Sequence, residues 1–392
     1  MADNKDKKVL NVPALRFPEF TEEWNKYLFD DIAQYKKGPF GSALKKEIFV
    51  PESNDTIKIY EQQNAIKKDW KLGRYFISKD YFINHMQQFV VKAGDIIVSC
   101  AGTIGEMYEL PQNAISGVFN QALMRVRVNT NLIDKNIFIE VFSSMINTFS
   151  KIYSNGSAIK NIPPFADLKR TVVFIPMKNE QEKISKFISL IDERIATQNK
   201  IIEKLETLIK GIRHNVFQQL RKDVGFNSTI GDILSFEQPQ RYIVSSTEYS
   251  DDSSCTPVLT ANKAFILGYT TETDGIYSKG DCIIIDDFTL DCKYVSFPFK
   301  IKSSAIKILT AENKYILRFI YEYLKSLDIS TEEHKRHYIT EIQPSSCILP
   351  DDKTLTTIAL MFESITNKLE NEQSLALMLN KQKQYLLSKM FI

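Results

Sequence analysis

Three neighbouring residues have the types that nuclease chemistry would need. Asp351, Asp352 and Lys353 place two carboxylates beside a lysine, and nucleases hold a divalent ion on clustered carboxylates in this way. The same residues, however, follow a strand-like segment and open a predicted helix, where aspartate is explained by capping and by the helix dipole. We therefore interpret them as a helix start and expect no catalytic residue in this chain.

Other motifs typical of catalysis or of cofactor binding are interrupted or missing. His334 and His337 have no cysteine or carboxylate residues at zinc-ligand spacing, so no metal site is expected. The segment Asn161-Ile162-Pro163-Pro164-Phe165 is similar to the Asn-Pro-Pro-aromatic motif of amino-methyltransferases, but Ile162 interrupts it. The sequence contains no Gly-x-Gly and no Gly-Lys, which excludes a dinucleotide fingerprint and a P-loop. We expect no cofactor on this chain.

The composition is that of a soluble chain with more than one core. Its 392 residues are 43% hydrophobic and 25% charged, which is typical of ordered domains and favours two or three of them. The 50 Lys and Arg against 48 Asp and Glu leave a net charge of +2, so any basic surface must be local. Five cysteines without Cys-x-x-Cys spacing, and no apolar run of membrane-spanning length, predict reduced thiols in a cytoplasmic protein.

An internal repeat covers most of the chain. Residues 175–217 align with residues 349–391 without a gap at an offset of 174, and farther upstream Asp31 aligns with Asp232 at an offset of 201. The second copy is therefore shorter by 27 residues, as expected when two copies share a framework but differ in their loops. We expect a pseudo-twofold arrangement of four segments, with boundaries at residues 1–175, 176–224, 225–349 and 350–392.

The second segment of each copy has the heptad spacing of a coiled-coil seam. In the first copy the seam residues are Ile184, Ile188, Ile191, Ile195, Ile202, Leu205, Ile209 and Ile212, and in the second they are Ile358, Phe362, Ile365, Leu369, Leu379 and Leu386. Gln198 and Glu372 occupy matching polar positions, and the last turns leave a second register open through Leu375, Met378 and Tyr385. The pattern predicts an antiparallel intramolecular coiled coil about 50 Å long. Two helices of an ordinary bundle are the alternative.

The first segment of each copy is typical of a mixed α/β (α+β) globular domain. Short β-rich runs are bounded by turn residues, and one amphipathic helix follows late in each copy. The strands are expected at residues 95–99, 123–128, 171–175, 281–286, 305–309 and 347–349, and the helices at residues 134–150 and 314–327. A polar loop with basic residues follows each helix.

Two similar domains without catalytic motifs, joined by long helices, suit the reading of two sites on one DNA duplex. Candidate phosphate contacts and base readers gather in the loops, since lysine and arginine bind phosphates and amides pair with adenine. They are Lys36, Lys37, Ser42, Lys45, Lys46, Gln62, Gln63, Asn64, Asn120, Gln121, Ser157, Lys160, Asn161, Asn262, Lys335, Arg336, His337 and Tyr338. Each alone is also explained as a solvated surface residue.

The sequence resembles the specificity (S) subunits of type I restriction-modification systems. The resemblance rests on residues 12–20 (Val-Pro-Ala-Leu-Arg-Phe-Pro-Glu-Phe) with Trp24, on the Gly-Asp-Ile-Ile run at 94–97, and on the Ile-Pro-x-x-x-Glu-Gln-x-x-Ile entry into the first heptad helix. It spans essentially the whole chain. The second copy departs from the pattern, because residues 351–355 replace the Glu180-Gln181 junction.

The resemblance implies a chain without catalysis of its own. Two target-recognition domains would each bind one half of an asymmetric bipartite site in double-stranded DNA, and the long helices would set the spacer between the halves. Two methyltransferase (M) subunits would dock to give an adenine methyltransferase, and restriction (R) subunits would add translocation and cleavage. S-adenosylmethionine, ATP and magnesium would bind those partners, and no membrane is involved.

Two other classes of function remain open on the residues alone. A coiled-coil scaffold with two protein-binding domains would ignore DNA at any salt concentration, whereas a DNA reader loses affinity steeply as salt rises. A stand-alone nuclease centred on Asp351 and Asp352 would cut DNA with magnesium alone.

Overall fold

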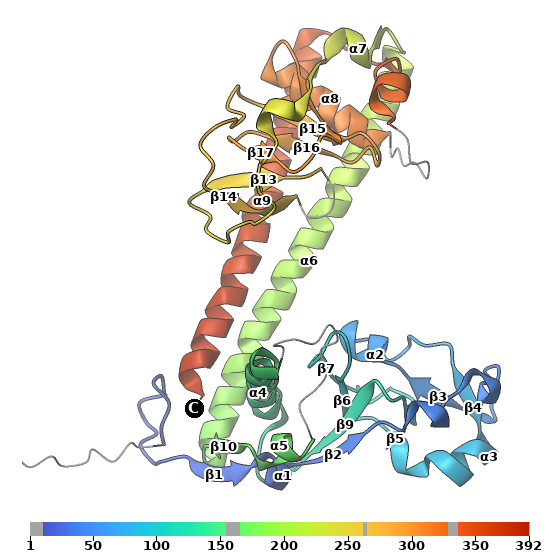
Figure 1. The fold of residues 1–392 in the computed structure, drawn as a ribbon, viewed down its shortest axis with the longest axis vertical. Helices are drawn as coiled ribbons and strands as arrows, with labels where there is room; N and C mark the ends of the chain where they lie inside the picture. Colours follow the sequence, from blue (N-terminus) through green and yellow to red (C-terminus); the bar gives the residue numbers. More distant parts are fainter. Residues whose placement is uncertain (1–10, 154–164, 262–264, 328–335, 392) are drawn as a thin grey trace, which may run out of the picture. The chain divides into compact units, whose positions relative to one another are not determined.

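A computed structural model describes residues 11–153, 165–261, 265–327 and 336–391. It divides into two compact units. The first unit comprises Met1–Ile195 with Met378–Ile392, and the second comprises Ala196–Leu377. Each unit therefore contains one mixed α/β domain and parts of both long helices (Figure 1).

Two four-stranded sheets form the first unit. One has the order β2-β9-β6-β7, with all neighbours antiparallel, and the other has the order β4-β3-β8-β5, in which β3 and β8 are parallel. The strands are β2 (Ala33–Lys37), β9 (Leu123–Val128), β6 (Ile96–Ser99), β7 (Met107–Glu109), β4 (Phe76–Ser78), β3 (Thr56–Tyr60), β8 (Gly117–Phe119) and β5 (Val90–Val91), and β1 (Asn25–Leu28) pairs separately with β10 (Val172–Ile175). The helices are α1 (Phe29–Ile32), α2 (Gln62–Ile66), α3 (Lys79–Tyr81), α4 (Lys135–Tyr153) and α5 (Phe165–Arg170). Short 3-10 or π turns lie at Gly41–Ala43, Lys46–Ile48, Phe82–Met86 and Gln87–Phe89.

Strand β6 lies between two cores of this unit, which explains its continuous apolar run at residues 96–98. Ile96 and Val98 belong to the core that α4 covers, whereas Ile97 points into the core of the second sheet. Because successive side chains of a strand point to opposite faces, a strand between two cores must be apolar at every position. Helix α4 contributes residues spaced by three and four, such as Phe138, Val141 and Phe142, to the first of these cores.

The second unit repeats this arrangement with fewer strands. Its sheets have the orders β12-β18-β15-β16 and β14-β13-β17, and β13 and β17 are parallel, as β3 and β8 are in the first unit. The strands are β12 (Ser235–Glu237), β18 (Ile306–Thr310), β15 (Cys282–Asp286), β16 (Cys292–Val295), β14 (Ile266–Thr270), β13 (Thr256–Leu259) and β17 (Lys300–Ile301), and β11 (Ser228–Thr229) pairs with β19 (Ser346–Cys347). The helical segments are α7 (Ile230–Ile233), α8 (Lys314–Ser326), a 3-10 turn at Pro239–Tyr242 and a π turn at Tyr338–Ile342. The mixed α/β fold class and the two-copy layout are thus confirmed.

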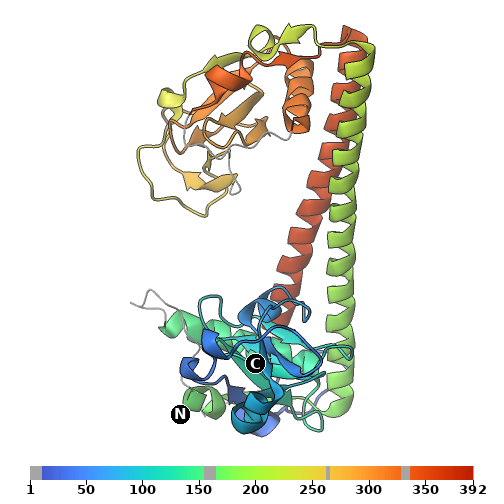
Figure 2. The ribbon, with the colours of Figure 1, turned by 90° about the vertical axis from the view of Figure 1, so that its right-hand side faces the viewer.

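Two long helices, α6 (Lys178–Asp223) and α9 (Asp352–Met390), follow the two domains along the chain. Within the second unit they lie side by side and antiparallel (Figure 1, Figure 2). Gln198 of α6 contacts Glu372 of α9, and Arg213, which comes later in α6, lies over the ring of Phe362, which comes earlier in α9. Within the first unit Lys383 of α9 pairs with Asp192 of α6 at 2.7 Å, in the same antiparallel sense. The expected antiparallel helix pair is therefore present.

The seam residues are buried or half-buried at every heptad position named above. The second register for the last turns of α9 is wrong, because Leu375, Met378 and Tyr385 are 38%, 65% and 63% exposed. The seam instead passes through Leu379 and Lys383, and the ammonium group of Lys383 is paired with Glu140 of α4 and with Asp192.

Candidate nucleic-acid interface

In the first unit, the ends of four strands meet at one corner. Three backbone hydrogen bonds join these ends. Directly after β2, the Gly38 N–H donates to the Leu123 carbonyl oxygen of β9 at 2.9 Å. The Asn120 N–H after β8 donates to the Tyr60 carbonyl oxygen of β3 at 3.1 Å, and the Cys100 N–H after β6 donates to the Ala122 carbonyl oxygen at 2.8 Å. A Cβ on Gly38 would lie 2.0 Å from the Asn120 carbonyl oxygen, so only glycine fits there. We call this place the first corner: it brings together Lys37, Gln62, Asn120 and Gln121.

Most of the candidate residues on the first unit are accessible. Lys37, Ser42, Lys45, Lys46, Gln63 and Gln121 are exposed. Lys36 is half-buried: its ammonium group donates to the side-chain oxygen of Gln88 at 2.8 Å and lies over the ring of Phe89. Gln62 is partly engaged, because its Nε2 donates to the carbonyl oxygens of Ala101 and Thr103.

Asn64 is wrong as a base reader. Its side chain is fully buried, its Oδ1 accepts from the Glu61 N–H at 2.7 Å, and its Nδ2 donates to the carbonyl oxygens of Asp69 at 2.9 Å and Leu72 at 2.7 Å. These three bonds cap α2 and close the loop after it, and a buried amide satisfied in this way has no edge left for a base. Asn120 also has a local role, because its Oδ1 accepts from the Ala122 N–H in the turn before β9.

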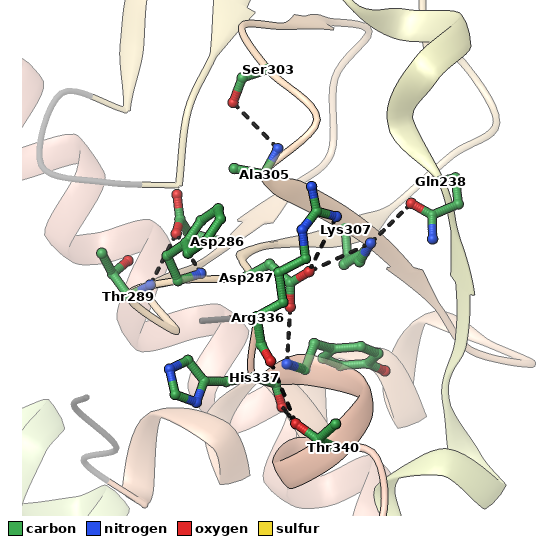
Figure 3. Close-up of polar contacts among 12 residues, drawn as sticks. Gln238, Asp286, Asp287, Thr289, Ser303, Ala305, Lys307, Arg336, His337 and Thr340 are labelled. Atoms are coloured by element: carbon green, nitrogen blue, oxygen red, sulfur yellow. Dashed lines mark hydrogen bonds and ion pairs between the residues drawn. The ribbon is translucent and has the colours of Figure 1, made fainter. Parts of the chain in front are cut away.

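The second unit has an equivalent corner at the ends of β12 and β15 and the start of β18. There the Asp287 N–H donates to the Ala305 carbonyl oxygen at 2.8 Å, as Cys100 and Ala122 bond in the first unit. We define the second corner by Gln238, Asp287, Lys307 and Arg336, which Figure 3 shows converging from four different segments. The two corners occupy the same place in the repeated topology but carry different side chains.

A buried carboxylate holds the second corner together. The Asp287 carboxylate accepts from the Tyr338 N–H at 2.9 Å and lies 3.5 Å from the ammonium group of Lys307, and both side chains are 2% exposed (Figure 3). Lys307 also donates to the Gln238 side-chain oxygen at 2.9 Å, so its charge has both an ionic and a neutral partner. Arg336 lies 3.7 Å from the same carboxylate and keeps 51% of its side chain exposed. The carboxylate therefore places a negative charge beside a guanidinium group at the surface.

His337 and Tyr338 are wrong as DNA contacts, because they are 1% and 0% exposed. Tyr338 packs edge-on against Phe236 in the core, and burial raises the pKa of its hydroxyl to about 12. The five remaining candidates, Ser157, Lys160, Asn161, Asn262 and Lys335, lie outside the described residues.

Sequence reasoning missed Asp287, Lys307 and Gln238. A signal was present, since Lys307 is a charged residue inside the apolar strand β18 and Asp287 directly follows β15, next to Asp286, the last residue of that strand. A charge in a buried strand requires a partner, and the end of the neighbouring strand is where that partner can lie.

The residues of the opening motif and of the helix junction hold the first unit together. Arg16 binds Glu180 through two hydrogen bonds of 2.7 and 2.6 Å, and the Glu180 side chain is 1% exposed. The Gln181 side chain accepts from the Asp134 N–H and donates to the carbonyl oxygens of Leu132 and Pro176. These contacts join the start of α6 to the start of α4. They position the framework rather than a ligand.

The carboxylate cluster at the start of α9 behaves as a cap. The Asp351 side chain accepts from the N–H groups of Lys353 and Thr354 and from the Thr354 hydroxyl, and these hydrogen bonds, that of the hydroxyl above all, lower the pKa of its carboxyl. Within the described ranges, no three His, Cys, Asp or Glu side chains gather as a metal ion would require. Cys292 and Cys347 are buried, and burial raises the pKa of each thiol to about 11.

None of the helices in the described part of the chain is long and apolar enough to cross a membrane. The α6 sequence is interrupted by charged residues throughout, in keeping with a helix that exposes most of its surface to water.

The comparisons with known proteins agree with one another. Residues 21–207 match the family described as the type I restriction modification DNA specificity domain. The chain is 41% identical over 143 residues to the specificity subunit of the type I restriction enzyme EcoR124I/EcoR124II of Escherichia coli, and this alignment spans 35% of the chain and 35% of that relative.

Solved structures share the fold over nearly the whole chain. The type I restriction-modification S subunit from M. genitalium superposes with a TM-score of 0.56 at 18% identity, covering 97% of this chain and 99% of that one. A chain from a structure of type I R-M complex assembly and conformational transition gives a TM-score of 0.50 at 13% identity over 94% of this chain and 97% of that one. Residues 21–207 thus match the type I restriction-modification DNA specificity domain, and the chain shares the fold of the solved type I S subunits.

Proposed function

We propose that this chain selects the DNA sequence on which a type I restriction-modification enzyme acts, and that each corner contacts one half of an asymmetric bipartite site in double-stranded DNA. The main support is that two equivalent corners present different side chains on one repeated framework. The target-recognition domains would comprise residues 1–175 and 225–349, and the helical segments would comprise residues 176–224 and 350–392.

The side chains at the first corner suit contacts with both phosphates and bases. Lys37, Lys45 and Lys46 are exposed, and lysine binds phosphates as a point charge. Gln63 and Gln121 are exposed amides, which can donate to and accept from one adenine edge at once.

At the second corner the corresponding charge is Arg336. A guanidinium group can form two parallel hydrogen bonds with guanine or with a phosphate, and a fixed orientation reduces the entropy lost on binding. The buried carboxylate of Asp287 lies 3.7 Å from the guanidinium group and favours such a position at the surface.

The chemistry would reside on partner chains. Two M subunits would transfer methyl groups to adenine from S-adenosylmethionine, and R subunits would use ATP and magnesium for translocation and cleavage. The division of labour is supported by the sequence, which has neither a glycine-rich cofactor loop nor a P-loop.

The proposal is tested by binding of the full chain, assembled with its methylating partner, to a pool of random duplexes. We expect recovery of two short sequence elements at a fixed spacing, with affinity that falls steeply as salt rises. Arg336→Ala should relax base preference in one element only, and Lys186→Ala on the exposed face of α6 is the matched control. A coiled-coil scaffold would return no enriched sequence and no salt dependence.

A further inference from the structure

An aromatic side chain protrudes from the turn beside the first corner. Phe40 is 89% exposed, the largest exposed fraction among the big apolar side chains of the described residues. The preceding residue, Pro39, is buried. Single exposed apolar side chains are common on protein surfaces, so what supports a role of Phe40 is its fixed position beside the first corner and the charges around it.

The turn that carries Phe40 is held firmly on both sides. Before it, Gly38 is bonded to the Leu123 carbonyl oxygen and lies too close to Asn120 to accept any side chain. After it, the Ala43 N–H donates to the Phe40 carbonyl oxygen at 2.9 Å, and the Ala43 carbonyl oxygen accepts from the Tyr81 hydroxyl at 2.8 Å. The ring is therefore presented by a fixed backbone.

Three lysines and one acidic residue, Glu47, lie beside the turn, so positive charge is in excess there. Lys37, Lys45 and Lys46 are exposed, and none of the three forms an ion pair within the ranges that the structure covers. Positive charges around an exposed ring complement a polyanion with flat apolar faces inside it, which is the chemistry of DNA rather than of a neutral protein surface.

The second unit has the same turn with other side chains. β12 is the edge strand beside β18, as β2 is beside β9, and the chain leaves each of these edge strands through a buried proline followed by exposed residues. After Pro239 the exposed residues are Gln240 and Arg241. This turn is also anchored, because the buried Tyr242 donates to the Glu237 carboxylate at 2.9 Å.

We propose that these two turns determine base specificity: Phe40 makes an apolar contact with a base in one half-site, and Gln240 and Arg241 hydrogen-bond to base edges in the other. This inference rests on the proposed function and deepens it. An aromatic ring can cover a thymine methyl group or enter between two base pairs, and amide and guanidinium groups discriminate adenine and guanine. One framework would thus read two different half-sites through the residues after its proline.

The experiment uses the full chain with its methylating partner and selects bound duplexes from a random pool at fixed salt. Phe40→Ala should lower affinity for the preferred duplex at least tenfold and should relax base pairs in one half-site only. The slope of affinity against salt should stay unchanged, because no phosphate contact is lost. Gln240→Ala and Arg241→Ala should relax base pairs only in the other half-site. Ile83→Ala, which truncates another exposed apolar side chain of the first unit, is the matched control.

Three outcomes separate the possibilities. Variants that recover the original sequence with affinity within twofold overturn the role of the turns, whereas a wild-type complex without any two-part preference overturns the proposed function itself. Loss of assembly with the methylating partner, with base preference retained, would show that Phe40 meets protein and not DNA. Thermal unfolding of each variant checks the fold, and Phe40→Gln, which copies the second turn, replaces Phe40→Ala if that variant unfolds early.

Discussion

Gln198 on α6 donates a hydrogen bond from its Nε2 to the carbonyl oxygen of Glu372 on α9 at 3.0 Å, and these residues are the same position of the repeated segment. The two side chains also contact each other, and Lys368 pairs with the Glu372 carboxylate one turn earlier on α9. The two copies of the repeated helix therefore meet at the seam position that is polar in both. A polar pair at a single seam position specifies the register of a coiled coil at a cost in stability.

Replacing this polar pair by leucines should stabilise the helix pair. Gln198→Leu with Glu372→Leu continues the apolar seam, and we expect the free energy of unfolding to rise, because an apolar pair stabilises a seam position more than a polar pair does. Chemical denaturation measures this change. A double variant less stable than the wild type would show that the pair contributes stability and not only register.

Removing Arg16 should destabilise the first unit strongly. Glu180 is 1% exposed, so Arg16→Ala leaves a buried carboxylate without its cation and should lower the free energy of unfolding by about 3–5 kcal/mol. Glu19→Ala removes the partner of Lys183 from an exposed pair and should cost about 1 kcal/mol or less. Equal effects of the two changes would contradict the structural role of Arg16.

The lysines after the first turn should account for part of the salt dependence of DNA binding. Each lysine that neutralises one phosphate adds about 0.9 to the slope of log affinity against log salt. Lys45→Ala with Lys46→Ala should thus reduce the slope by about 2 without altering base preference, whereas Lys186→Ala should leave it unchanged. An unchanged slope in the double variant would remove both residues from the interface.

The carboxylate of Asp287 should be needed for the stability of the second unit. Among the residues that the structure describes, Asp287→Ala leaves the buried ammonium group of Lys307 with Gln238 as its remaining partner, and should lower the free energy of unfolding by about 3–5 kcal/mol. Adding Lys307→Met should restore part of the loss, because the uncompensated charge is then gone. If the second change makes no difference, the two side chains are not coupled.

The sequence predicts well those elements whose periodicity reflects burial. The strand expected at residues 123–128 is β9, and the helix expected at residues 314–327 is α8, which ends at Ser326. In both elements the apolar residues are regularly spaced because one face of the strand or helix packs against a core. The sequence leaves two registers open near the end of α9, because Lys383 looks unsuited to a seam until Glu140 and Asp192 are seen beside it.

The candidate site was predicted less completely, for a related reason. Asn64 and Tyr338 have side chains suited to DNA contact, but the structure buries them in capping and packing roles that depend on residues distant in sequence or on loop geometry. Loops have no regular spacing of apolar residues from which the burial of a side chain could be inferred. Phe40 shows the opposite case, an apolar residue that the fold leaves exposed.

The central claim is that two unlike corners on one repeated framework read two parts of one DNA site. Sequencing the duplexes bound by the purified complex, from a pool with random bases on both sides of variable spacers, tests it most directly. The account predicts two different enriched elements at one preferred spacing, each altered separately by changes in one corner. A single enriched element, or an unselected pool, would contradict it.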